Sequence, residues 1–174
     1  MLVEVKAGSA RIVDDIFTTL ADGEPLPDGP VIVSLKRFLA EKDGLLARAH
    51  PLGVRLETAE SPELLGPELH RLAAVALHVH HFRDGRHFSW ARLLRTRLDY
   101  RGEVRIGGHV LKDQIAFYAR VGVNVFDLAQ NIALRDIEAA LSEISQVYQP
   151  SVDGRPTIQD LRAARAHGAL VPPT

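Results

Sequence analysis

The sequence predicts a single α/β domain made of successive β–α units, with a mainly parallel sheet of about five strands and a β-hairpin at the N-terminus. Three observations predict it. Short runs rich in Val, Ile and Leu alternate with stretches of helical spacing, Gly and Pro separate them, and residues 72–126 follow the order strand, helix, strand, helix, strand. Such units build either an open three-layer sheet or a half-barrel, and the pattern does not distinguish the two.

The N-terminal part is predicted to hold the hairpin and the first β–α unit. Residues 2–5 and 10–14 are alternating apolar runs around a Gly-Ser pair, which is typical of a hairpin that covers a sheet edge. Residues 18–30 are rich in Gly, Pro and Asp and indicate a connecting loop. Residues 31–35 then form a compact apolar strand, and the helix that follows ends near Gly44.

The middle of the chain repeats this alternation. A strand is predicted at residues 54–57, and a helix opens at Ser61-Pro62-Glu63 with Ser as N-cap and Pro in the first position. The most apolar run, residues 72–79, indicates a central strand. An Asp-Gly-Arg turn at 84–86 then leads into a helix entered at Ser89.

The last units continue in the same order. A strand is predicted from Glu103 to Ile106, a helix from about Val110, and a further strand after Gly122. Apolar residues at helical spacing from Ile137 to Tyr148 predict a packed helix. We therefore assign the α/β domain to 1–149.

The C-terminal residues 150–174 and the overall composition limit the class of protein to which the chain can belong. This C-terminal extension, with too few apolar residues for a core, is expected to be partly helical or mobile. A formal net charge of −1 with 46% hydrophobic residues indicates a globular protein and not a nucleic-acid-binding polycation. With no apolar run long enough for a membrane span and no signal-peptide pattern, we expect a cytoplasmic protein.

Cysteine is absent from the sequence, and this limits the redox chemistry of the chain itself. Thiolate nucleophiles, disulfide exchange and Cys-ligated iron–sulfur clusters are all excluded. A redox role would need a bound organic cofactor, and the sequence identifies none.

An arginine-rich stretch is the strongest indication of a ligand. Seven arginines stand against three acidic residues between positions 83 and 105. The guanidinium group suits carboxylate, sulfate and phosphate, and ligands of open parallel sheets bind beyond the carboxyl ends of the strands. Arg83, Arg86 and Arg105 stand on or after predicted strands and are the best candidates for binding an anion. Helical spacing puts Arg92 and Arg95 on a solvated face.

Six further residues complete the candidate anion site. They lie at the turns and helix entries beside these arginines: Asp84, Ser89, Gly107, Gly108, Asp113 and Gln114. Paired glycines let backbone amides approach an anion, and the core-facing amide of Gln114 must bind a neighbouring loop or a ligand. Each residue also has a structural interpretation, because acidic residues favour helix N-termini and paired glycines favour tight turns.

A histidine run follows the predicted central strand. His78 and His80 project from one face of that strand, in the i, i+2 geometry of some metal sites. The sequence places no third ligand beside them. From the sequence alone we therefore predict no metal site.

Several long motifs resemble a bacterial family of unknown function. They are DGRHFSWARLLR at Asp84–Arg95, YRGEVRIGG at Tyr100–Gly108, VLKDQ at Val110–Gln114 and ARVGVNVF at Ala119–Phe126, with weaker similarity in PLPDGPVIVSL at Pro25–Leu35 and PLGVRLE at Pro51–Glu57. Members of this family are described as probable oxidoreductases of sulfite reduction, because their genes lie beside that of the assimilatory sulfite reductase. The histidine run lies outside these motifs.

The resemblance implies an accessory protein of assimilatory sulfite or sulfate reduction that acts by binding. Its partner would be the sulfite reductase or the electron donor of that enzyme. The residues themselves favour an alternative, an enzyme or sensor that binds a sulfated, phosphorylated or carboxylated metabolite at the arginine-rich site. A structural homo-oligomer is a third interpretation, and no catalytic constellation in the sequence decides among the three.

Overall fold

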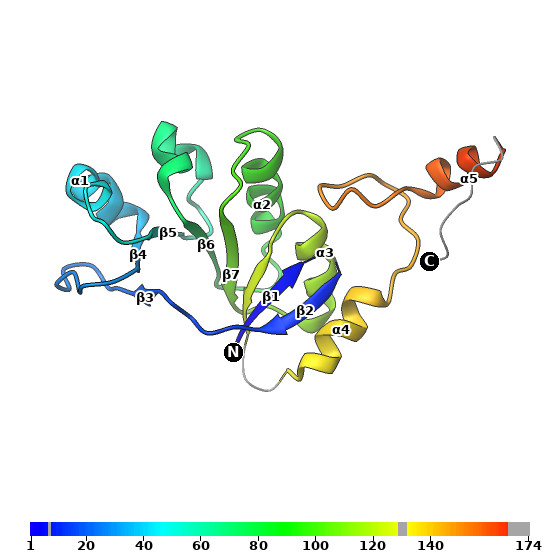
Figure 1. Ribbon diagram of the computed structural model, residues 1–174, viewed down its shortest axis with the longest axis horizontal. Coiled ribbons are helices and arrows are strands. Elements are labelled where there is room, and N and C mark those ends of the chain that lie inside the picture. The colour runs from blue at the N-terminus through cyan, green and yellow to red at the C-terminus, as the bar shows by residue number, and fades with distance from the viewer. Residues whose placement is uncertain (7, 129–131, 167–174) are drawn as a thin grey trace.

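The computed structural model describes residues 1–6, 8–128 and 132–166, so residues 167–174 of the predicted C-terminal extension lie outside the described part. Eight strands form one mixed sheet in the order β2-β1-β8-β7-β6-β5-β4-β3 (Figure 1). The strands are β1 (Leu2–Lys6), β2 (Ser9–Ile12), β3 (Thr18–Thr19), β4 (Val31–Ser34), β5 (Leu52–Leu56), β6 (Ala74–Val79), β7 (Glu103–Gly108) and β8 (Val125–Asp127).

The α/β class is confirmed, but the predicted count of about five strands is too low. The strands from β3 to β8 pair in parallel, and the predicted hairpin β1–β2 joins the same sheet by pairing β1 antiparallel to β8. The strand that the sequence does not indicate is β3, which lies in the predicted loop at 18–30. It has only two residues, both exposed, so it forms no apolar pattern.

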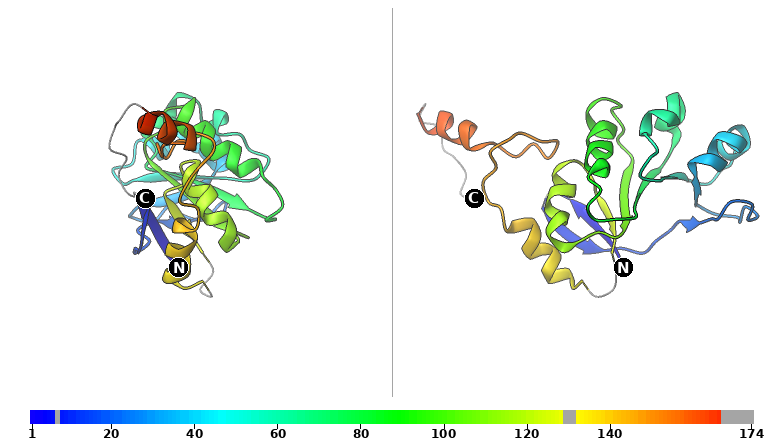
Figure 2. Two further views of the ribbon diagram at one scale, coloured as in Figure 1. Left: turned by 90° about the vertical axis from the view of Figure 1, so that its right-hand side faces the viewer. Right: turned by 180° about the vertical axis from the view of Figure 1, so that it is seen from behind.

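Strand order follows chain order from β3 to β8, and this distinguishes the two predicted architectures. Because β–α–β crossovers are right-handed, an order without a reversal puts every connecting helix on the same face of the sheet. The helices accordingly contact one another in sequence, η1 between α1 and α2, and α3 between α2 and α4. Figure 2 shows these helices side by side along the sheet. The sheet is a curled half-barrel, and the open three-layer alternative is wrong.

The helices differ from the sequence predictions mainly at their ends. They are α1 (Leu35–Leu46), η1 (Pro62–Arg71), α2 (Arg86–Thr96), η2 (Lys112–Gln114), α3 (Ile115–Arg120), α4 (Leu134–Ser142) and α5 (Ile158–Ala166). Element η1 is a 3₁₀ helix and not an α-helix, because Gly66, with a φ of 62°, and Pro67 interrupt it. Helix α4 ends at Ser142, well before the predicted end at Tyr148.

The main core lies between the sheet and the helices. It contains large, fully buried side chains from both layers, among them Phe38, Leu77, Leu94, Ile106 and Phe126. The other face of the sheet carries only a small apolar cluster: Phe17, Ile32, Ala74 and Ala76. The rest of this helix-free face, which we call the open face, is therefore free to hold polar and charged side chains.

Beyond α4 the chain leaves the body of the domain. It runs through an extended segment to α5, which has no buried residue and stands apart from the sheet (Figure 1). No helix in the described ranges is long and apolar enough to cross a membrane.

Candidate functional site

The loop after β6 carries three of the predicted anion-binding residues, and two of them bind each other. Nη2 of Arg86 lies 2.7 Å from Oδ2 of Asp84, and the backbone N–H of Arg86 donates to Oδ1 of Asp84 at 3.1 Å. These hydrogen bonds from Arg86 lower the pKa of Asp84 to about 2. The guanidinium of Arg86 therefore already faces a carboxylate.

Arg83, the third residue of the loop, has no such partner. Its guanidinium lies 5.5 Å from the centre of the Phe82 ring, and with the residues that the structure describes it forms no hydrogen bond or ion pair. It lines a shallow hollow beyond β6 and β7, whose lining residues are His81, Phe82, Arg83, Asp84, Gly85 and His109. The hollow thus presents one uncompensated guanidinium at the carboxyl ends of two parallel strands.

Gly107, Gly108 and Gln114 shape this region. The φ of Gly108 is 88°, and a side chain there would clash with the carbonyl oxygen of Val79 on the neighbouring strand. Nε2 of Gln114 donates to the carbonyl oxygen of Phe82 at 2.8 Å, so its amide binds a neighbouring loop, one of the two partners expected. The structural interpretation therefore accounts for Gly108 and Gln114.

Of the nine predicted site residues, Arg83 and Asp84 line the hollow, and the other seven, Ser89 and Asp113 among them, do not. Ser89 is not the entry to its helix, because α2 begins at Arg86 and Gly85 holds the N-cap position. Ser89 instead lies inside the helix and is exposed. Asp113 is exposed on η2. The backbone N–H of Arg86 donates to the Asp84 carboxylate at the turn, and the helix begins there, earlier than the Ser signal suggests.

Arg105 lies apart from the loop arginines. It stands in the middle of β7, is only 5% exposed, and projects on the open face. Its Nη1 donates to Oδ2 of Asp15 at 2.6 Å and its Nε to Oε1 of Glu103 at 2.7 Å. This guanidinium is buried between two carboxylates, so the structure does not bring Arg105 together with Arg83 and Arg86 at the hollow.

Arg95 also departs from its predicted place on a solvated face. Its guanidinium donates to the carbonyl oxygens of Gly122, Tyr100 and Gly102 and to Oδ1 of Asn124, at 2.8–3.1 Å. Burial lowers the pKa of Arg95. The side chain ties α2 to the entries of β7 and β8, whereas Arg92 on the same helix is exposed as predicted.

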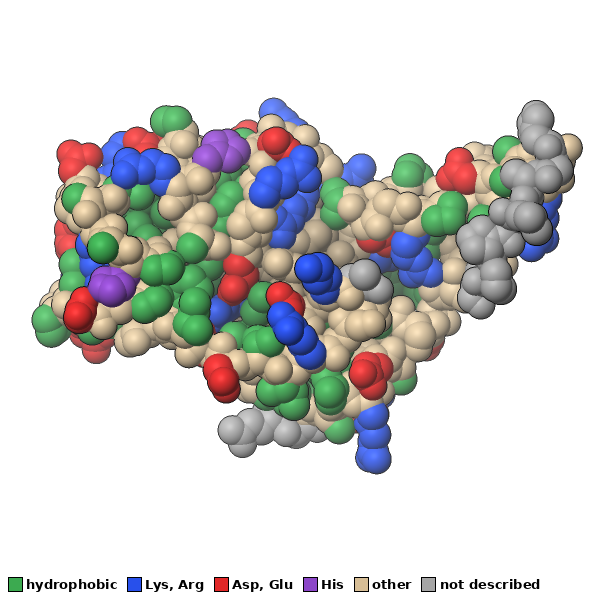
Figure 3. Space-filling model, in the orientation of Figure 1, with side chains coloured by type: hydrophobic (Ala, Val, Ile, Leu, Met, Phe, Trp, Pro, Cys, Tyr) green, Lys and Arg blue, Asp and Glu red, His purple; other side chains and the backbone are tan. Residues whose placement is uncertain are grey.

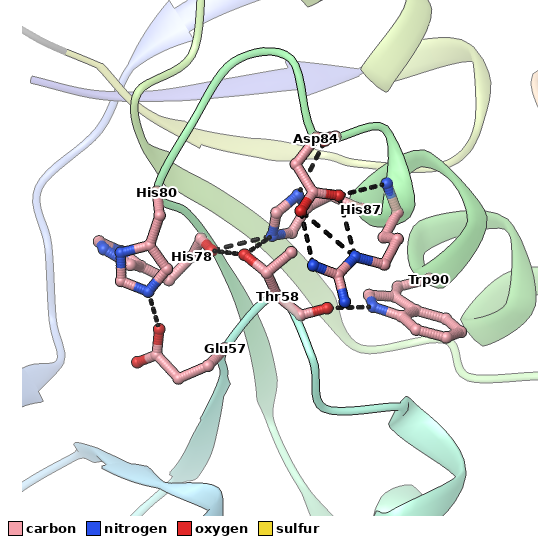
Figure 4. A network of polar contacts seen from close by, with 8 residues as sticks. Glu57, Thr58, His78, His80, Asp84, His87 and Trp90 are labelled. Atoms are coloured by element: carbon pink, nitrogen blue, oxygen red, sulfur yellow. Dashed lines mark hydrogen bonds and ion pairs between the residues drawn. The ribbon is translucent and has the colours of Figure 1, made fainter.

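A second polar cluster lies on the open face at the ends of β5 and β6 (Figure 4). Nε2 of His80 lies 2.6 Å from Oε2 of Glu57, and the rings of His78 and His80 meet edge to face with centroids 4.7 Å apart. Nε of Arg55 donates to the other carboxylate oxygen of Glu57 at 3.0 Å. Burial lowers the pKa of His78. The cluster holds two imidazoles and a carboxylate whose position is fixed.

Residues behind this cluster fix the ends of the two strands. The fully buried His87 places Nε2 2.8 Å from the carbonyl oxygen of His78 and 3.2 Å from Oγ1 of Thr58. Because a carbonyl oxygen only accepts, Nε2 of His87 is the donor in the contact with His78. Nε1 of Trp90 donates to the carbonyl oxygen of Thr58 at 3.3 Å. Helix α2 thereby anchors both strand ends through His87 and Trp90.

Comparison with known proteins places the chain in a family. The model of the family described as "Bacterial protein of unknown function (DUF934)" matches residues 53–158. This chain belongs to that family. No curated protein matches the chain. The DUF934 match begins in β5 and ends at the start of α5, so it includes the hollow and the cluster of Glu57, His78 and His80.

The DUF934 chain has another concave surface, a groove of about 550 Å³ between α3, α4 and the segment that leads to α5. Phe117 and Ile144 line it and are 49% and 37% exposed. Arg120 and Arg155 stand at its edge, and Nε of Arg120 lies 2.9 Å from Oδ2 of Asp153. On the face seen in Figure 3, basic side chains gather over α2. The groove therefore combines exposed apolar side chains with two arginines.

The sequence alone did not identify Glu57 as part of the histidine cluster. Glu57 comes from a different β–α unit, 21 residues before His78. One signal could have found it: Glu57 directly follows β5, and β5 and β6 are consecutive parallel strands, so their carboxyl ends meet at one edge. Without the register of the two strands, however, the face on which Glu57 projects is undetermined.

Proposed function

We propose that the protein binds a small oxyanion at the hollow beyond β6 and β7, and that it serves assimilatory sulfite or sulfate reduction as an accessory protein through this binding. The observation that carries the proposal is the guanidinium of Arg83, which has no acidic partner in the described part of the chain. Arginine suits oxyanions of the sulfite, sulfate and phosphate type because it donates parallel hydrogen bonds.

The surroundings of Arg83 favour a small ligand. The hollow is shallow, His81 and His109 stand beside Arg83, and its one carboxylate, on Asp84, is already bound by Arg86. Ligands of parallel β–α–β folds bind beyond the carboxyl ends of the strands, where this hollow lies. The link to sulfite reduction comes from the resemblance described above, and the absence of cysteine makes binding a better role than redox chemistry by the chain itself.

Thermal unfolding in the presence of sulfite, sulfate, phosphate and adenosine phosphosulfate tests the anion site. A ligand that binds the native state raises the unfolding midpoint, and the Arg83→Ala variant should lose that rise. Sulfate and phosphate also stabilise proteins in general, so Arg135→Ala, an exposed arginine on α4, is the matched control. Equal shifts in both variants and the parent protein would refute the site.

The choice of ligand separates the accessory role from the alternative. If adenosine phosphosulfate or another organic phosphate shifts the midpoint and inorganic anions do not, the site belongs to an enzyme or sensor of a sulfated or phosphorylated metabolite. If sulfite alone shifts it, an accessory role in sulfite reduction gains support. In both cases the shift should depend on Arg83.

The groove favours a protein partner as a second candidate. An exposed Phe beside an exposed Ile with arginines at the rim has the composition of a small docking surface. We expect the purified sulfite reductase or its electron donor to bind the protein, and Phe117→Ser to weaken that binding at least tenfold. Leu39→Ser, at a leucine 52% exposed on α1, is the control. Binding that is unchanged by Phe117→Ser would exclude the groove.

A further inference from the structure

Three side chains on the open face can supply ligand atoms to one metal ion. Glu57, His78 and His80 each offer one such atom, and all of these atoms lie within 4.8 Å of one another. In a tetrahedral zinc site the ligand atoms lie about 2.0–2.2 Å from the ion and roughly 3.3 Å from one another. The observed separations, from 2.6 Å between His80 and Glu57 up to at most 4.8 Å, bracket this value.

The fold brings the three residues together through strand register. Leu56 pairs with Leu77 in the parallel ladder of β5 and β6, so the next residues, Glu57 and His78, are neighbours across the two strands. His80 follows His78 by two positions and projects from the same face. That face carries no helix, so an ion held there is accessible from solvent.

On the β7 side of β6, the register partner of His78 is Gly107. Gly107 has no side chain, so nothing from β7 covers the flank of His78 at this level. The next register partner, Asp127 on β8, is exposed and lies beyond Gly107. On its Gly107 side, an ion bound by the three ligands would therefore face the side chain of Asp127, whose Oδ2 lies 3.6 Å from where a Cβ on Gly107 would stand.

The donor set and its supports match those of known metal sites. Two imidazoles and one carboxylate bind zinc and other divalent transition metals and leave positions for water or a ligand. Arg55 binds Oε1 of Glu57 and leaves Oε2 directed at His80. His87 and Trp90 fix the backbone of His78 and Thr58 from behind, which is the kind of outer support that metal sites need.

We propose that Glu57, His78 and His80 form a binding site for one divalent transition-metal ion of the zinc type, with an open coordination position on the open face. Arg83 is not among these ligands, so the metal site and the anion site are independent proposals, and a failed test of one does not refute the other. The competing explanation is an ion pair between Glu57 and a protonated His80, with His78 as a neighbour.

Calorimetric titration of the EDTA-treated protein with ZnCl₂ tests the proposal. We expect one ion per chain, and at least tenfold weaker binding in His80→Ala, His78→Ala and Glu57→Gln. The control is His50→Ala, because Nε2 of His50 lies 2.7 Å from Oδ1 of Asp28 in an exposed His–Asp pair without a second imidazole. This variant should bind zinc as the parent protein does.

Two further measurements keep the result unambiguous. The side chain of His80 is 57% exposed, so His80→Ala should fold normally, and its thermal unfolding without metal should match the parent protein. Co²⁺ in place of Zn²⁺ should give a visible absorption band typical of low coordination number, which His80→Ala abolishes. Zinc affinity that is the same in the parent protein, His80→Ala and Glu57→Gln, or no binding at all, would overturn the proposal and leave the ion pair as the explanation.

Discussion

The guanidinium of Arg105 reaches Asp15 across 90 residues of sequence, with Nη1 of the arginine 2.6 Å from Oδ2 of the aspartate. Arg105 is 5% exposed and stands in the middle of the parallel sheet, whereas Asp15 belongs to the segment between β2 and β3. This segment crosses the open face, and Phe17 places its ring 5.5 Å from the same guanidinium. The ion pair therefore holds the start of the chain against the centre of the sheet.

Removing this carboxylate should destabilise the protein. Asp15→Ala leaves the buried Arg105 with Glu103 as its one acidic partner among those that the structure describes, and we expect a loss of roughly 1–3 kcal/mol in the free energy of unfolding. Urea unfolding measures it. Asp14→Ala, the exposed neighbour, is the control and should change stability by less than about 0.5 kcal/mol. Equal losses in the two variants would contradict the role of the pair.

The same pair predicts a pH dependence. Partial burial acts to raise the pKa of Asp15, but hydrogen bonds from Arg105 and the Phe17 backbone outweigh it and hold the pKa below its usual value. A carboxyl whose pKa is lower in the folded state stabilises the protein above its unfolded pKa of about 3.9, and this stabilisation is lost as the pH falls through the folded value. The stability gap between the parent protein and Asp15→Asn should therefore narrow below about pH 4. If the difference in stability between the two proteins is constant from neutral pH down to about pH 3, the Asp15–Arg105 pair is not the source of the pH dependence.

Arg95 should contribute more to stability than any other arginine of α2. Its four acceptors join α2 to Gly122, Tyr100, Gly102 and Asn124, and the alanine variant would leave partly buried carbonyl oxygens without these donors. We expect Arg95→Ala to cost roughly 2–4 kcal/mol, and Arg95→Lys to recover only part of this because an ammonium group cannot span the same acceptors. Arg92→Ala should be nearly neutral in the same denaturation experiment.

Two buried tyrosines should respond differently to loss of the hydroxyl group. The hydroxyl of Tyr118 is buried and has no hydrogen-bond partner in the described part of the chain, and burial raises its pKa to about 12. The hydroxyl of Tyr100 donates to the carbonyl oxygen of Leu72 at 3.1 Å. Tyr118→Phe should therefore keep or raise the unfolding free energy, and Tyr100→Phe should lower it by about 1 kcal/mol. The opposite ranking would show that the Tyr118 hydroxyl has a partner that matters.

Much of the fold could be predicted because local patterns determine it. The β–α units of residues 31–126 follow directly from apolar runs and turn residues, and the hairpin from two alternating segments. The half-barrel could not be chosen in advance, because the handedness rule needs a strand order that periodicity does not supply. The strand β3 was missed because two exposed threonines joined by backbone hydrogen bonds have no side-chain signature.

The sequence indicates which candidate arginines follow a strand, but not which residues bind them. Arg83, Asp84 and Arg86 follow a strand, and this placement is local information. Whether an arginine is free or bound depends on distant residues, and neither Asp15 for Arg105 nor Gly122 for Arg95 is indicated by the local pattern. Helical spacing predicted a solvated Arg95, but a long side chain can extend along the surface of its helix and place its guanidinium against a neighbouring strand.

The pairing of β1 with β8 has a consequence for biosynthesis. Val3 pairs with Phe126, so β1 finds this partner strand only after more than a hundred further residues have been made. At typical rates of translation this interval is roughly ten seconds. The parallel units can associate one after another as they emerge, but during that time the N-terminal hairpin exposes an unpaired edge that a chaperone can occupy. The pairing of β1 with β8 should therefore be a late event in folding.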